Sequence, residues 1–142
     1  DYKKALATLD EMPVGNDKKT ELLQLGNRCE IFWAMEDSDK MSSELDLFKS
    51  KKDNSTDSIC ALLEVKLAAL RSEVSDTQLE LVRDTLRTAN NELFRLNLKY
   101  LLGLIYAQHG NLDFAAQYLR EVCSSGKQIA ITQKAKTALN TL

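Results

Sequence analysis

The sequence predicts an all-α protein, and three observations carry this prediction. Apolar residues recur at spacings of three and four along the 142 residues, which is the pattern of amphipathic helices. Only five glycines and one proline are present, whereas strands and hairpins are usually bounded by more of both. Apolar residues make up 44% of the chain and charged residues 28%, so the composition is that of a folded domain and argues against disorder.

Eight apolar stripes predict eight helices, and turn or capping residues separate them. Pro13, Gly15 and Asn16 end the first helix, and the polar stretch 49–57 is the best candidate for a loop. Ser75 or Asp76 is placed to cap the fifth helix. The expected helices begin near Tyr2, Lys18, Asp39, Thr56, Asp76, Leu93, Leu112 and Ile129.

The spacing of these helices indicates a repeat. Short connections favour antiparallel helical hairpins. The longer or more apolar helices alternate with shorter ones, and the starts of both series advance by about 36 to 38 residues. A period in this range is typical of a solenoid, in which hairpins stack on one another.

The best motif lies in residues 99–119, where Leu102-Gly103 and Tyr106 are followed by Ala115 and Leu119. This segment resembles the tetratricopeptide signature W-x2-L-G-x2-Y … A-x3-F, although Lys99 stands at the Trp and the closing Pro is absent. Leu22-Leu23-Gln24-Leu25-Gly26-Asn27-Arg28-Cys29 is a weaker copy, in which Leu25-Gly26 holds the Leu-Gly slot. In the middle repeat Leu67-Ala68 could hold this slot, but its register stays open.

The resemblance implies a right-handed solenoid of antiparallel helical hairpins, similar to tetratricopeptide repeats, that spans residues 1–142 as a single domain. Gly103 would let the second helix approach the first closely, with Ala115 opposite it. Gly110 would take the left-handed conformation that ends the first helix. Tyr2–Met12 matches a second helix whose first helix is missing, so we expect the chain to be the C-terminal part of a longer protein.

The resemblance also implies a binding surface. In tetratricopeptide proteins the first helices of successive repeats line a concave groove that holds an extended peptide or a partner helix. Asn27 and Asn97 are the only amides or cations at the positions where some members clamp a C-terminal carboxylate, so we expect no such clamp and a less charged ligand. The residues that we expect to bind the partner are Leu23, Asn27, Glu30, Asn97, Tyr100, Leu104 and Gln108.

The sequence does not indicate an enzyme, a cofactor or a metal site. His109 is the only histidine and has no partners that suggest a triad, and the fingerprints of phosphate and dinucleotide binding are absent. Cys29, Cys60 and Cys123 lack the C-x-x-C spacing of a zinc site. We interpret them as buried thiols, which favours a reducing compartment and hence a cytoplasmic location.

The charge balance and the hydropathy restrict the partner. The net charge of −2 does not favour nucleic acid, and no run of about 18 or more apolar residues exists that could insert into a membrane. We therefore expect a non-catalytic scaffold that binds a protein or a peptide. The alternative is a sensory or regulatory domain of a larger signalling or transcription-regulating protein. The oligomeric state stays open.

Overall fold

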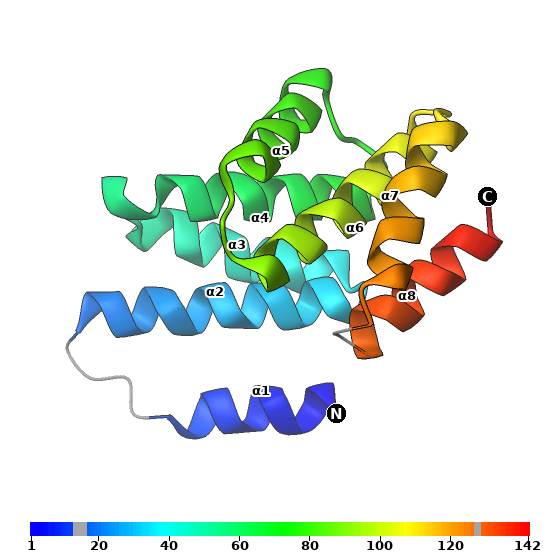
Figure 1. Ribbon diagram of the computed structural model, residues 1–142. Coiled ribbons are helices and arrows are strands. Elements are labelled where there is room, and N and C mark those ends of the chain that lie inside the picture. Colours follow the sequence, from blue (N-terminus) through cyan, green and yellow to red (C-terminus); the bar gives the residue numbers. More distant parts are fainter. Residues whose placement is uncertain (13–16, 127–128) are drawn as a thin grey trace. The chain divides into compact units, whose positions relative to one another are not determined.

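The computed structural model describes residues 1–12, 17–126 and 129–142 (Figure 1). The regular secondary structure of these residues is entirely helical, and each α-helix packs against at least one neighbour, so the all-α prediction is confirmed. The chain divides into two compact units, Asp1–Arg71 and Ser72–Leu142. The elements are α1 (Tyr2–Glu11), α2 (Lys18–Ala34), α3 (Ser38–Lys51), the 3-10 turn η1 (Asn54–Thr56), α4 (Asp57–Leu70), α5 (Asp76–Thr88), α6 (Glu92–Gln108), α7 (Leu112–Ser124) and α8 (Ile129–Asn140).

The expected helix starts agree with the observed ones to within one residue, and Ser75 forms a capping box with Gln78 at the start of α5. The expected loop over 49–57 is wrong in part. Helix α3 continues to Lys51, because the positive charges of the lysines in its last turn interact favourably with the negative end of the helix dipole. The turn η1 forms where the Asp53 carboxylate accepts a hydrogen bond from the backbone N–H of Ser55. The expected break at Pro13, Gly15 and Asn16 lies outside the described residues.

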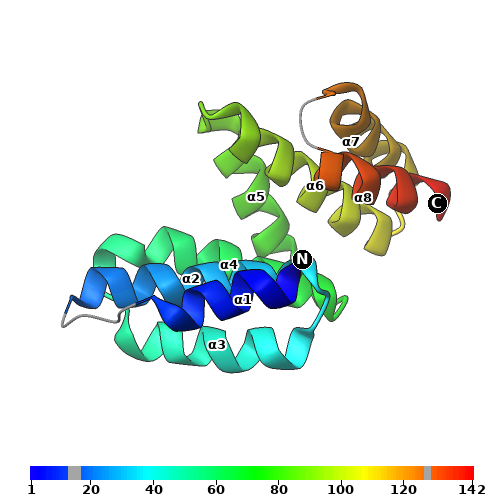
Figure 2. The same ribbon diagram turned by 90° about the horizontal axis from the view of Figure 1, so that it is seen from below.

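In the first unit, α2 and α3 form an antiparallel hairpin, α4 packs on both of its helices, and α1 lies along α2 (Figure 2). One apolar cluster joins them, and partly buried Trp33 packs against it beside buried Phe32. The buried members of this cluster come from three helices: Leu22, Cys29, Phe32, Met41, Leu45, Phe48, Cys60 and Leu63.

Helix α1 is attached to this unit mainly at its surface. None of its residues is buried, although Leu6 packs against the apolar cluster. The Arg28 guanidinium on α2 pairs with the Asp10 carboxylate of α1 and lies 3.2 Å from the Glu44 carboxylate of α3. These two ion pairs tie three helices together and raise the pKa of Arg28 against the opposing effect of its partial burial.

In the second unit, α6 is the central helix and packs against α5, α7 and α8. Tyr106 on α6 is buried, and its ring centroid lies 5.2 Å from that of Phe114 and 5.9 Å from that of Tyr118, both on α7. Nearer the start of α6, Tyr100 packs against an apolar cluster formed by α7 and α8. The buried members of that cluster are Leu119, Val122, Ile131 and Ala135.

Gly103 makes the close helix contact that the sequence predicts, but with a different partner. A Cβ at Gly103 would lie 2.7 Å from the Cγ and Cδ2 atoms of Leu119, and 3.5 Å from the Ala115 carbonyl oxygen. The expectation that the Ala115 side chain lies opposite is therefore corrected. The smallness of Gly103 makes room for a leucine one turn farther along α7.

The hairpins α2–α3 and α6–α7 turn in the same way. Glu36 and Gly110 both have positive φ, 58° and 79°, so the prediction for Gly110 is confirmed. In each hairpin the next residue donates its backbone N–H to a carbonyl of the preceding helix, Asp37 to Phe32 at 3.0 Å and Asn111 to Tyr106 at 2.9 Å. These bonds are the 6→1 contacts of a Schellman cap.

Candidate functional site

A groove of about 620 Å³ lies between α2 and the start of α4 in the first unit. Its lining comes from α2, η1 and α4, with Phe48 of α3 at the base. The volume falls within the range of pockets that hold small ligands or short pieces of polypeptide. The lining residues are Lys18, Lys19, Leu22, Leu23, Gly26, Asn27, Glu30, Phe48, Asp53, Ser55, Thr56, Ile59 and Leu63.

The floor of the groove is apolar and belongs to the core, while its two walls expose apolar side chains. Leu22, Phe48 and Leu63 form the floor and are buried. Leu23 on α2 and Ile59 on α4 are 64% and 51% exposed. Two large aliphatic side chains on opposite walls of one hollow form a site that gains free energy when an apolar group covers them, because that surface then leaves water.

Gly26 also lines the groove and lies on α2, one helical turn after Leu23. A Cβ built on Gly26 would meet only the Phe48 ring, at 3.6 Å, which is an ordinary van der Waals contact. The packing of α2 against α3 therefore does not require glycine here, although glycine inside a helix costs about 1 kcal/mol relative to alanine. Because Gly26 has no side chain, the groove is deeper at this position.

The two ends of the groove carry different charges. Lys18 and Lys19 lie at one end, on the first turn of α2, and their ammonium groups make no ion pair with another described residue. At the other end both carboxylate oxygens of Glu30 accept from the Lys66 ammonium of α4, at 2.7 and 2.8 Å. The glutamate is thus neutralised inside the protein, whereas the two lysines face solvent.

Polar groups that could hold a polypeptide backbone also line the groove. The exposed amide of Asn27 forms no hydrogen bond with another described residue, so it can both donate and accept. Asp53 is already engaged, because its carboxylate accepts from the Ser55 hydroxyl and backbone N–H. These bonds, with the nearby Lys18, lower the pKa of Asp53 against a smaller effect of desolvation.

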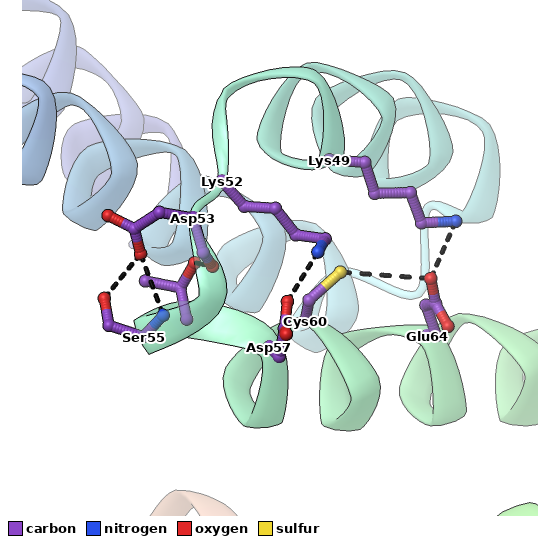
Figure 3. A network of polar contacts seen from close by, with 8 residues as sticks. Lys49, Lys52, Asp53, Ser55, Asp57, Cys60 and Glu64 are labelled. Atoms are coloured by element: carbon purple, nitrogen blue, oxygen red, sulfur yellow. Dashed lines mark hydrogen bonds and ion pairs between the residues drawn. The ribbon is translucent and has the colours of Figure 1, made fainter.

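The start of α4 is held against α3 by a set of polar contacts (Figure 3). The Lys49 ammonium lies 2.9 Å from the Glu64 carboxylate, and Lys52 pairs with Asp57. The side-chain hydrogen bonds to these carboxylates raise the pKa of each lysine. Buried Cys60 lies beside Glu64, and burial raises the pKa of its thiol. This network fixes the wall of the groove that carries Ile59.

The structure brings together three of the seven residues expected to bind the partner. Leu23, Asn27 and Glu30 all line the groove. The other four lie on α6 in the second unit and do not join this site. Asn97 donates to the Leu93 carbonyl at 2.9 Å, and Tyr100 packs against the α7–α8 cluster. Leu104 is half-buried and Gln108 is exposed.

Sequence reasoning missed Lys18, Lys19, Gly26 and Ile59. Lys19 and Gly26 stand one helical turn from Leu23 in either direction, so a longer stripe along α2 would have found them. Ile59 could not be found in this way, because only the packing of α4 places it opposite Leu23.

The described residues also bear on two further kinds of site, a metal site and a catalytic histidine. In residues 1–12, 17–126 and 129–142, no group of three or more His, Cys, Asp or Glu side chains comes together as a metal site requires. His109 ends α6, and its Nε2 lies 3.0 Å from the Val74 carbonyl oxygen, where it joins two segments of the second unit.

None of the helices in the described part of the chain has the length and hydropathy that crossing a bilayer requires.

Comparison with known proteins finds no family model, no curated protein and no solved structure that matches this chain. The resemblance to tetratricopeptide repeats therefore rests on the residues quoted above.

Proposed function

We propose that this protein is a non-catalytic interaction module, whose hairpins stack in the manner of tetratricopeptide repeats and whose α2–α4 groove binds a segment of a partner protein. The observation that carries the proposal is the coincidence of Leu23, Asn27 and Glu30 with a groove between two non-consecutive helices. The helical stripe was chosen from the sequence, and the groove comes from the structure.

The chemistry of the groove favours binding over catalysis. Its lining offers apolar surface, an amide, two hydroxyls, two ammonium groups and two carboxylates. Neither carboxylate is poised as a base, because Glu30 is paired with Lys66 and Asp53 accepts from Ser55. A fully buried leucine or isoleucine contributes roughly 1.5–3 kcal/mol relative to an exposed one, so covering Leu23 and Ile59 would supply a substantial part of a micromolar affinity.

Gly26 allows a test that does not depend on knowing the partner. Gly26→Leu would fill the groove from its floor, and it replaces a weak helix former by a strong one, so α2 is expected to keep its stability. Gly26→Ala is the matched control, because it removes the same glycine and leaves most of the groove open. Both variants are first compared with the parent by thermal unfolding.

The measurement is selection of a phage-displayed library of random nine-residue peptides on the parent and on both variants. We expect the parent and Gly26→Ala to enrich related peptides, and Gly26→Leu to enrich none of them. Peptides that bind parent and Gly26→Leu equally well would show that binding occurs outside the groove.

A further inference from the structure

We infer that the ligand of the α2–α4 groove is an extended segment of about five residues, in which a large apolar side chain sits over Gly26 and an acidic residue about three positions away meets Lys18 and Lys19. The inference rests on the proposed function and adds the conformation and the chemistry of the ligand.

The length of the groove sets the length of the ligand. From Lys18 to Glu30 the α2 backbone rises about 18 Å, at about 1.5 Å per residue. An extended chain covers this distance in about five residues, at about 3.3 Å per residue. The ion pair between Glu30 and Lys66 joins α2 and α4 at the far end.

The polar lining favours an extended ligand over a helix. A helix satisfies its own backbone groups, whereas an extended segment presents N–H and C=O groups along its length. The unengaged amide of Asn27, about three quarters of the way from Lys18 to Glu30 along α2, can pair with such groups.

Gly26 marks the position of the apolar side chain. It lines the groove one helical turn from exposed Leu23, and the space beside it is open except for the Phe48 ring. A leucine, methionine or phenylalanine of the ligand placed there would therefore lie beside the Leu23 side chain and over the buried aromatic ring, with exposed Ile59 lining the same groove from α4. A charged residue at this place would lose its hydration without gaining a partner.

Charge decides the second position. Glu30 is neutralised by Lys66, and the Asp53 carboxylate, which lies near Lys18, offsets one of the two ammonium groups of Lys18 and Lys19, so one positive charge is left for a ligand. The N-terminus of α2 adds the positive end of its helix dipole. The α2 backbone rises about 10 Å between Lys19 and Gly26, which is about three extended residues.

The test is a charge reversal, Lys18→Glu with Lys19→Glu. Acidic residues in the first turn favour a helix, so α2 stays formed. Lys3→Glu with Lys4→Glu is the matched control, since it makes the same change of charge on the first turn of α1, outside the groove. The probes are random nine-residue peptides on phage, followed by the strongest binder as a synthetic fluorescent peptide in anisotropy titrations.

We expect the parent and the control to enrich peptides with an acidic residue about three positions from a large apolar one. The groove variant should lose this acidic preference and bind the synthetic peptide about tenfold more weakly, since two exposed ion pairs are lost. Proline beside the anchor residue should change the affinity less than threefold, because an extended chain accepts it.

The outcomes separate this inference from the proposed function. Peptides that are lost with Gly26→Leu but show no acidic preference, or that require a helix, would overturn the inference and leave the groove as the binding site. Peptides that Gly26→Leu still binds would overturn the proposed function as well. A parent protein that enriches no peptide contradicts both.

Discussion

The hairpins α2–α3 and α6–α7 have the same type of turn between their helices, which we call the corner. They differ in how closely the two helices approach each other. Counted from Asp37 and Asn111, the residues that follow the left-handed position, Cys29 and Gly103 both lie eight residues before the corner. Leu45 and Leu119 both lie eight residues after it. The first hairpin thus accommodates a thiol where the second has room for a hydrogen atom only.

The comparison also shows what the glycines are for. Gly26 faces Phe48 and makes no tight contact. It lies about one helical turn farther from its corner than Gly103 lies from the corner of the second hairpin. The two Leu-Gly pairs therefore match in the motif but not in the packing. Gly103 serves the contact between helices, and Gly26 is free to shape the groove.

The largest expected difference concerns the reactivity of the Cys29 thiol, which occupies in the first hairpin the position that Gly103 has in the second. Burial raises the pKa of the Cys29 thiol to about 12, and the nearby Glu44 and Glu30 carboxylates add to this rise. Because the thiolate is the nucleophile, native Cys29 should react with iodoacetamide at pH 8 at least about a hundredfold more slowly than half-buried Cys123. Peptide mass spectrometry after timed labelling measures both rates.

The same pKa predicts how stability depends on pH. The folded pKa lies above that of an unfolded cysteine, about 8.5, so the contribution of Cys29 is complete below that pH and is lost as the pH rises toward 12. Between pH 8.5 and 10 the free energy of unfolding should fall more steeply for the parent than for Cys29→Ala. Equal slopes, or equal labelling of Cys29 and Cys123, would contradict the burial of Cys29 in the hairpin.

The two glycines should respond to alanine with opposite signs. Gly103→Ala forces the buried Leu119 side chain to move and should destabilise the protein by about 1–3 kcal/mol. Gly26→Ala gains helix propensity without a clash and should stabilise it by up to about 1 kcal/mol. Urea unfolding gives both values.

A double variant identifies the cause. If the clash with Leu119 is responsible, Gly103→Ala should cost less when Leu119 is already alanine. The comparison between the hairpins fails if Gly103→Ala and Gly26→Ala have the same effect.

The smallest expected effects lie at the corners. Glu36 adopts a left-handed backbone that costs a residue with a Cβ about 1 kcal/mol, and Gly110 adopts the same conformation without this cost. Glu36→Gly should therefore stabilise the protein by up to about 1 kcal/mol, and Gly110→Ala should destabilise it by about as much. Thermal unfolding of the two single variants checks the opposite signs, and a loss of stability in Glu36→Gly would show that its side chain has another role.

The sequence predicted those parts of the fold that depend on local pattern. Helix starts, a cap at Ser75 or Asp76 and the left-handed Gly110 follow from spacing and from the chemistry of single residues. The contact partner of Gly103 was missed because it depends on where α7 crosses α6. A motif gives the order of residues but not the level at which two helices meet.

The site divides in the same way. Leu23, Asn27 and Glu30 share one face of a helix, and helical periodicity is enough to find them. Lys66 and Ile59 come from α4, between 29 and 43 residues later, and only tertiary packing brings them to that face. The cationic end of the groove was overlooked because Lys18 and Lys19 precede the repeat motif used to choose the positions.

The lack of buried residues in α1 determines how this helix forms. Its ten residues are fewer than the roughly 12–15 that an isolated helix needs in water, so it has little helical structure when detached. The segment therefore becomes helical only when it docks on the rest of the first unit, through Leu6 and through the ion pair with Arg28. Its amide hydrogens should exchange with solvent earlier than those of α2, through an opening that leaves the rest of the unit folded.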